Sequence, residues 1–133
     1  YNLFDTHANQ ADPHSTLWKN ISRAVTDFYS DVTSRDHNQE ILIMMFTEFG
    51  RRVRDNGTGT DHGTGGGVII IGDSVKGGLY GEYPSLDQAK LEDGGDLQHT
   101  VDFRSVYSTI VDRWMGLDPV SVVGGNFEQI DFL

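Results

Sequence analysis

The sequence of 133 residues contains no cysteine, only three prolines, and fewer basic than acidic residues. The absence of cysteine excludes disulfide bonds, thiolate metal ligands and a cysteine nucleophile. Ten Lys and Arg against 20 Asp and Glu give a net charge of −10, which disfavours binding to the phosphate backbone of nucleic acids. The longest apolar run, residues 41–46, is much shorter than the roughly 20 residues that a membrane-spanning helix needs. We therefore expect neither a nucleic-acid partner nor a membrane span.

The remaining composition is that of one folded domain. Hydrophobic residues make up 37% of the chain and charged residues 23%, which excludes a disordered tail. A chain of this length buries roughly two thirds of its unfolded surface, enough for a hydrophobic core. The chain begins at Tyr1 rather than Met, so we expect it to be one portion of a longer protein.

Two segments have the apolar spacing of amphipathic helices. The first begins near Asp12-Pro13, because a proline is favoured in the first turn of a helix. Its apolar residues recur at helical intervals: Leu17, Ile21, Val25, Phe28 and Val32. The second helix is predicted over residues 103–114, with Asp102 placed to cap its start and Gly116 to end it.

Three short apolar segments, residues 1–4, 41–46 and 68–71, have the length of strands. The second is apolar without alternation, as in a strand that is buried on both faces of a parallel sheet. The polar, glycine-rich residues 51–67 are interpreted as a loop, and residues 72–84 as turns with a short hairpin. The order strand, helix, strand, loop, strand, helix is typical of α/β proteins. We therefore predict a three-layer α/β/α sandwich with a mostly parallel sheet, as a partial domain.

Acidic and histidine side chains follow the ends of these strands. Asp5 and His7 follow the first strand, and Glu48 follows the second. Asp61 and His62 lie in the glycine-rich segment before the third strand. Because ligands gather at the carboxyl ends of parallel strands, we expect these groups to converge. Their nitrogen and oxygen atoms suit Zn or Mn, and their oxygens alone suit Mg or Ca, so the pattern predicts a divalent metal site.

The same residues also allow a purely structural interpretation. Asp5 would then cap a turn, and His62 would hydrogen-bond the loop backbone. Glu48 would pair with Arg51 or Arg52, and such a pair stabilises little when it is exposed. The spacing of the residues does not decide between the two interpretations.

Two further side chains are candidates for substrate binding. Arg51 lies in the basic cluster of residues 51–54 and, in so acidic a chain, could hold a substrate anion. His99 precedes the second helix and could swing toward the glycine-rich segment. That segment is not a phosphate-binding loop, because it lacks the Gly-Lys-Ser/Thr ending and precedes a strand rather than a helix.

Four segments carry a resemblance to a known family: residues 4–10 (FDTHANQ), 47–52 (TEFGRR), 59–63 (GTDHG) and 75–81 (VKGGLYG). In this order they resemble the C-terminal part of the DUF1501 family, and the resemblance covers essentially the whole chain, residues 1–133. That family is grouped with the alkaline phosphatase and sulfatase superfamily. The grouping implies an α/β/α sandwich, a metal site at the strand ends, hydrolysis of phosphate or sulfate esters and, often, export from the cytoplasm.

The resemblance assigns the metal ligands in two ways. In both, Asp5 begins the first ligand segment and His7 is the nearest histidine. One alignment matches Asp61-His62-Gly63 to the Asp-His-Gly of the superfamily. The other, which we prefer, matches Glu48 to the acid at the strand end, puts Phe49 in a ligand position and leaves His62 as a later, lone ligand. Phe49 cannot bind a metal, which argues against a complete two-metal site.

These expectations combine into one hypothesis, a metal-dependent hydrolase of small anionic phosphate or sulfate esters. The ion would be Zn, Mn, Mg or Ca. The nucleophile would come from an N-terminal portion of the same protein, so residues 1–133 alone would be inactive. The alternative is a catalytically degenerate binding or surface-associated structural protein. A calcium-binding module is a weaker option, since no loop has the spacing of an EF-hand.

Overall fold

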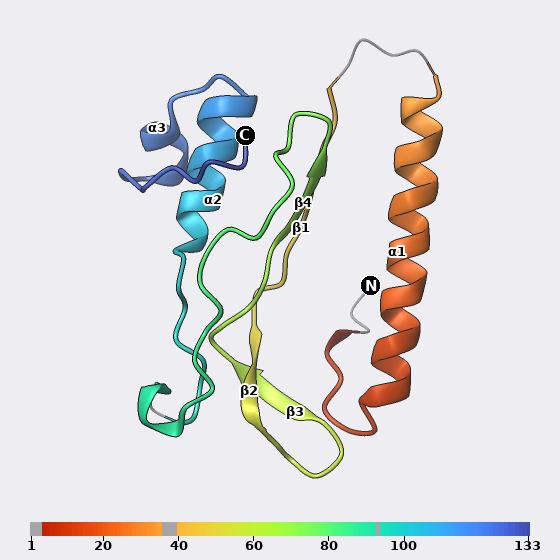
Figure 1. Cartoon of the computed structure of the whole chain (residues 1–133), viewed down its shortest axis with the longest axis vertical. Helices are drawn as coiled ribbons and strands as arrows, with labels where there is room; N and C mark the ends of the chain where they lie inside the picture. The colour runs from red at the N-terminus through yellow and green to blue at the C-terminus, as the bar shows by residue number, and fades with distance from the viewer. Residues whose placement is uncertain (1–3, 36–39, 93) are drawn as a thin grey trace.

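The computed structural model describes residues 4–35, 40–92 and 94–133. A long N-terminal helix and a group of short C-terminal helices stand on opposite sides of an antiparallel strand pair, and a second strand pair lies beyond one end of the first (Figure 1). In chain order the elements are α1 (Ala11–Thr33), β1 (Leu42–Met45), β2 (Gly50–Asp55), β3 (Thr60–Gly63), β4 (Ile69–Gly72), the 3₁₀ turn η2 (Gln88–Lys90), α2 (Phe103–Thr109), the π-helical turn η3 (Ile110–Trp114) and α3 (Pro119–Val123).

The four strands form two separate antiparallel pairs. β1 pairs with β4, in a register that sets Leu42 against Gly72 and Met45 against Ile69. β2 and β3 are consecutive and form a hairpin, with Arg51 opposite His62 and an irregularity between Arg51 and Asp55. The hairpin is thus inserted in the chain between the two strands of the other pair (Figure 1).

The predicted parallel α/β/α sandwich is wrong, because the described residues contain no parallel strand pair. The strands expected at 41–46 and 68–71 are confirmed as β1 and β4, but their relative direction was misjudged. The segment interpreted as a loop, residues 51–67, contains most of a hairpin, which sends the chain back beside β1 in the opposite direction. A parallel pair would instead need a long crossover connection, usually a helix.

Two further expectations about strands are not met. Residues 1–3 of the first expected strand lie outside the described residues, and Phe4 is not in a strand. The hairpin expected within residues 72–84 is wrong, since after Gly72, the end of β4, this segment has one turn, isolated bends and irregular backbone without a strand pair. Its glycine content shortens any apolar run that could pair, because glycine weakens a strand.

The predicted first helix is confirmed as α1, whose apolar stripe is half-buried except for the exposed Phe28. The Tyr29 hydroxyl donates a hydrogen bond to the carboxylate of Asp73, just after β4, and ties this helix to the β1–β4 pair. No helix in the described part of the chain combines the length and the apolar character needed to cross a membrane.

The second predicted helix is confirmed as α2 and its continuation η3. Asp102 accepts a hydrogen bond from the Arg104 backbone N–H and caps the helix as expected. The helix buries Ile110 and Val111, which, with Phe132, form the buried apolar core of the described residues. The helix therefore packs against the C-terminal segment of the chain.

Thr109 joins α2 to that C-terminal segment. Its side chain is fully buried, and its hydroxyl donates to the Ser105 carbonyl at 2.7 Å. The same oxygen accepts a hydrogen bond from the Ile130 backbone N–H at 2.9 Å. One buried hydroxyl thus satisfies two backbone groups and holds residues 130–132 against the helix.

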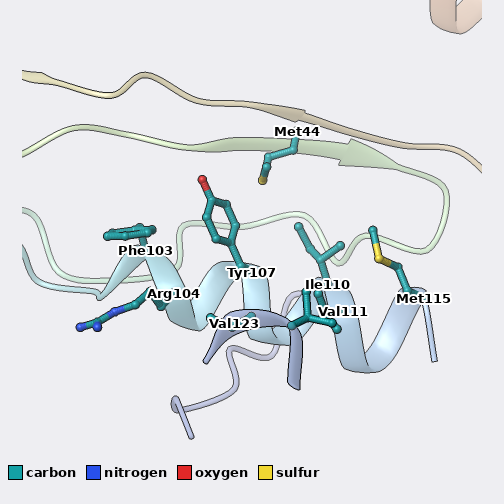
Figure 2. Close-up of a pocket in the computed structure, with 9 residues that line it drawn as sticks. Met44, Phe103, Arg104, Tyr107, Ile110, Val111, Met115 and Val123 are labelled. Carbon is teal, nitrogen blue, oxygen red and sulfur yellow. The ribbon is translucent and has the colours of Figure 1, made fainter. Parts of the chain in front are cut away.

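A mostly apolar groove of about 460 Å³ lies between β1 and the C-terminal helices (Figure 2). Met44 of β1 lies across the groove from Tyr107 of α2 (Figure 2). The Phe46 and Tyr107 rings meet edge to face with centroids 6.5 Å apart, which is a favourable aromatic geometry. The residues that line the groove are Met44, Phe103, Arg104, Tyr107, Ile110, Val111, Met115, Val122 and Val123.

Replacing Thr109 with valine should lower the free energy of unfolding by about 1–3 kcal/mol, because the Ile130 N–H would lose its acceptor. Chemical denaturation of the full-length protein measures this loss. Thr109→Ser keeps the hydroxyl and should lose less stability. Equal losses for the two variants would show that the hydroxyl does not hold the C-terminal segment.

The charge on Asp102 should stabilise the protein only above acidic pH. Hydrogen bonds from the Arg104 side chain, and then from its backbone N–H, lower the pKa of Asp102 from 3.8 to about 2. Because the pKa is lower in the folded state, the stabilisation is present above about pH 4 and is lost as the pH falls toward 2. Asp102→Asn should therefore unfold at lower urea concentration than the wild type at pH 6, and the two midpoints should converge near pH 2.

The matched control is Asp112→Asn, since Asp112 is an exposed acid with no ion pair among the described residues. It removes the same charge without removing a contact to Arg104, so it isolates the effect of that contact. A gap between Asp102→Asn and the wild type that stays constant from pH 6 to 2 would contradict the assigned role of the charge.

Candidate metal centre

The segment of residues 4–10 lies against the β2–β3 hairpin. The guanidinium of Arg51 donates to the Thr60 carbonyl at 2.6 Å and to the Phe4 carbonyl at 2.7 Å. The Gln10 backbone N–H donates to the Thr58 carbonyl at 2.9 Å. The bonds to Phe4 and from Gln10 therefore hold this segment, which we call the N-terminal loop, on the hairpin, while the bond to Thr60 fixes the guanidinium within the hairpin.

Gly59, in the turn of the hairpin, allows this close contact. It is buried, and a Cβ atom built on it would lie 2.5 Å from the carbonyl oxygen of His7. The side chain of Asn56, at the start of the same turn, donates to that carbonyl at 2.9 Å. Any side chain at position 59 would thus push the N-terminal loop away from the hairpin.

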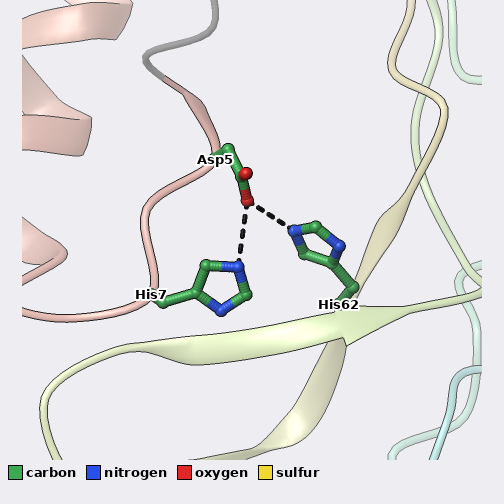
Figure 3. Close-up of side chains that lie close together, drawn as sticks. All are labelled: Asp5, His7 and His62. Carbon is green, nitrogen blue, oxygen red and sulfur yellow. Dashed lines mark hydrogen bonds and ion pairs between the residues drawn. The ribbon is translucent and has the colours of Figure 1, made fainter.

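Docking of the loop brings one carboxylate and two imidazoles together (Figure 3). Asp5 Oδ1 lies 2.6 Å from Nε2 of His62 and 3.0 Å from Nε2 of His7. One potential ligand atom from each residue lies within 4.8 Å of the other two. All three side chains are exposed, so the group opens to solvent and is a candidate metal centre, here called the Asp-His-His cluster.

A second carboxylate lies behind His7. Oδ1 of Asp61 is 3.5 Å from Nδ1 of His7, the ring nitrogen that does not face Asp5. The Asn56 side chain also donates to Asp61 at 3.0 Å, so Asn56 contacts both His7 and its carboxylate partner. Asp61 is therefore placed to orient His7 rather than to join the cluster itself.

The electrostatics of the site follow from these contacts. The hydrogen bond with His62 is the main cause that lowers the pKa of Asp5. The hydrogen bond from Asn56, followed by the one with His7, lowers the pKa of Asp61. Both carboxylates are consequently ionised at neutral pH, as metal binding requires.

The donor set of the cluster fits a divalent ion. Two imidazoles and one carboxylate form the kind of three-residue set that holds catalytic zinc and leaves a fourth position open. Ligand atoms around a tetrahedral zinc lie about 3.4 Å apart, given metal–ligand distances of roughly 2.1 Å. The separations of 2.6 and 3.0 Å at Asp5 are hydrogen-bond distances, so the group would open by some tenths of an ångström around an ion.

The candidate residues from the sequence are only partly brought together. Asp5, His7 and His62 form the cluster, and Asp61 adjoins it through His7. Glu48 is exposed and makes no hydrogen bond or ion pair within the described ranges, and it is not part of the cluster. The parallel sheet that was to bring the strand ends together is not formed, so nothing places Glu48 beside the others.

The two candidates for substrate binding lie elsewhere. The Arg51 guanidinium is engaged by two backbone carbonyls, and this use leaves it little capacity for a substrate anion. His99 is exposed in the segment before α2 and lies close enough to Asp102 to contribute to its lowered pKa. It is not part of the Asp-His-His cluster.

A polar groove of about 620 Å³ adjoins the cluster through Asp61. Arg52 lines it and is paired with Asp96 at 3.1 Å. Arg54 also lines it and, within the described residues, makes no ion pair or hydrogen bond. The full lining consists of Arg52, Arg54, Asp55, Asn56, Gly57, Asp61 and Gly94.

Comparison with family models matches residues 1–126 to DUF1501, which is described as a protein of unknown function. The chain belongs to the DUF1501 family. The resemblance seen in the sequence is thereby confirmed at the level of the family. No curated protein and no solved structure matches the chain. The geometry of the Asp-His-His cluster is therefore the basis for its role in this DUF1501 protein.

Asn56 and Phe49 are the site residues that the sequence analysis did not assign. Asn56-Gly57 is the dipeptide of a tight hairpin turn, and Gly57 has the positive φ of 107° that such turns need. That signal could have predicted the hairpin and hence the proximity of Asn56 to Asp61. Phe49, considered only as an absent ligand, stacks on the ring of His62.

Gly59→Ala should separate the N-terminal loop from the hairpin and cost about 1–3 kcal/mol of stability, because its Cβ collides with the His7 carbonyl. Cross-relaxation between the His7 and His62 ring protons, whose ring centroids are 4.6 Å apart, measures the separation. Gly67→Ala is the control, since nothing lies within 4 Å of the added carbon. Unchanged cross-relaxation in Gly59→Ala would refute the docking geometry.

Proposed function

We propose that this DUF1501 protein binds one divalent metal ion through Asp5, His7 and His62 and uses it to hydrolyse phosphate or sulfate esters. The observation that carries the proposal is the convergence of three potential ligand atoms, from segments far apart in the sequence, within 4.8 Å. The preferred ion is zinc, since two of the three donors are imidazole nitrogens.

The chain supplies an oriented and accessible site for such an ion. Asp61 lies 3.5 Å from Nδ1 of His7, and with an ion bound it would accept the N–H at Nδ1 while Nε2 turns its lone pair to the ion in place of its contact with Asp5. The ligand side chains are between 41% and 49% exposed, so water or a substrate oxygen can reach the same ion. A bound ion would polarise the ester oxygen and lower the pKa of a coordinated water.

An anionic ester would need local positive charge, because the chain as a whole carries a net charge of −10. Arg54 is suited to that role, as it lines the polar groove that adjoins Asp61 and has no ion-pair partner among the described residues. The cluster contains no hydroxyl or thiol nucleophile. In this proposal a residue from outside the present sequence, or a coordinated water, attacks the ester.

A second candidate function is a binding or surface-associated structural role without catalysis. Two observations favour it: the Asp5 carboxylate is already hydrogen-bonded by two imidazoles, and Phe49 covers the ring of His62. In that case the cluster would only join the N-terminal loop to the hairpin. The two functions differ in whether substitution of the cluster changes metal binding.

Zinc titration of the full-length protein by calorimetry should show one ion bound per chain. His62→Ala and Asp5→Asn should each weaken binding by more than about 100-fold, since even loss of an outer partner costs 10–100-fold. Glu128→Gln, which removes an exposed carboxylate outside the cluster, should bind zinc as the wild type does.

Turnover is tested with the same full-length protein on a panel of aryl phosphates and aryl sulfates. Activity should disappear with a chelator and return when the metal is added back. Zinc binding that the cluster substitutions weaken, without turnover of any ester, would keep the metal site and contradict the hydrolysis. Neither metal binding nor turnover would end the hydrolase proposal.

A further inference from the structure

The two histidines of the cluster are oriented by different kinds of partner. His7 has a carboxylate at each ring nitrogen, Asp5 at Nε2 and Asp61 at Nδ1. His62 contacts only Asp5 through its Nε2, and within the described residues its Nδ1 has no hydrogen-bond partner. Apart from its bond to Cβ, the ring is therefore held by one polar contact, so a further contact would help to fix its plane.

Phe49 supplies a contact of the required kind. Its ring lies on that of His62 with centroids 3.7 Å apart and planes 13° from parallel. Such a face-to-face contact fixes the plane of the imidazole, although it does not engage either nitrogen. It also remains when Nε2 is used for a metal ion, whereas the hydrogen bond between His62 and Asp5 does not.

Close packing of the neighbouring backbone fixes the position of Phe49. It directly precedes Gly50, the buried first residue of β2, which pairs with Gly63 next to His62. A Cβ atom on Gly50 would lie 1.7 Å from the Gly65 carbonyl oxygen, so the backbone is closely packed at this point. The Arg51 guanidinium, held by two carbonyls, lies 5.1 Å from the centroid of the Phe49 ring. This cation–π contact adds a second partner for the ring.

We propose that Phe49 is the positioning residue for His62: its stacked ring holds the imidazole in the plane that directs Nε2 toward Asp5 and a shared metal ion. The inference rests on the metal site proposed above. Phe49 therefore stands beside a metal ligand as its support.

Three variants of the full-length protein test the role. Phe49→Leu removes the aromatic ring and keeps an apolar side chain, and Phe49→Tyr keeps the ring. Phe46→Leu is the matched control, because Phe46 is an exposed phenylalanine of the same chain that contacts Tyr107 instead. If stacking positions His62, Phe49→Tyr should retain what Phe49→Leu loses, and Phe46→Leu should behave as the wild type.

Two measurements are made on each variant. In the metal-free protein, the ring-proton shifts of His62 report the stacked ring, and the nitrogen shift of Nε2 reports its bond with Asp5. In Phe49→Leu we expect the upfield ring-current shift and the hydrogen-bond signature to be lost. In the titration with zinc we expect affinity to fall about 10-fold, the lower range for loss of a supporting partner.

The outcomes separate this inference from the proposed function. If the wild type binds zinc and Phe49→Leu binds it equally well, the inference is overturned and the metal site stands. If the wild type binds no zinc while Phe49→Leu still releases His62 from Asp5, the positioning role stands and the proposed function fails. An unchanged His62 in metal-free Phe49→Leu overturns the inference, whatever the metal result.

Discussion

The clamp formed by Arg51 is the interaction on which the candidate site depends. Its guanidinium joins the N-terminal loop to the hairpin through the carbonyls of Phe4 and Thr60. Hydrogen bonds from a charged donor contribute about 1.5–3 kcal/mol each, more than neutral ones. Because both acceptors belong to the main chain, the clamp needs no ionised carboxylate. It holds Asp5 near Asp61, two like charges that would otherwise separate, with His7 between them.

The elements α1, β1, β4 and the α2–η3 helix were predictable from the sequence, whereas the β2–β3 hairpin and the arrangement of the strands were not. The helical spacing of residues such as Leu17 and Val25 is a local property, and it predicted α1 correctly. The short apolar runs likewise predicted β1 and β4. Their relative direction depends on the connection between them, and the composition of residues 51–67 predicts a loop although Asn56-Gly57 is a hairpin signal. Without that hairpin turn, the pair of β1 and β4 is predicted to be parallel, whereas it is antiparallel.

The candidate site was predicted in part for the wrong reason. Asp5, His7 and His62 were grouped because strand ends meet in a parallel sheet, but they meet because a loop docks on a hairpin. Glu48 was included by the same argument and lies apart from the cluster, since that sheet does not form. The role of Arg51 could not be read from its charge alone. A guanidinium near the surface can hold an anion or a carbonyl, and only the approach of Phe4 decides between them.

The cluster also closes a long stretch of chain. Asp5 and His62 are 57 positions apart, and the segment between them contains α1, β1 and β2. Closing a loop of that size costs conformational entropy, and the cost is incurred whether or not an ion is present. An ion bound by both Asp5 and His62 would stabilise the closed loop reversibly. Ligands that bind only the folded state stabilise it in proportion to the logarithm of their free concentration. The supply of metal would then set the resistance of this half of the molecule to unfolding and to proteases, separately from any chemistry at the ion.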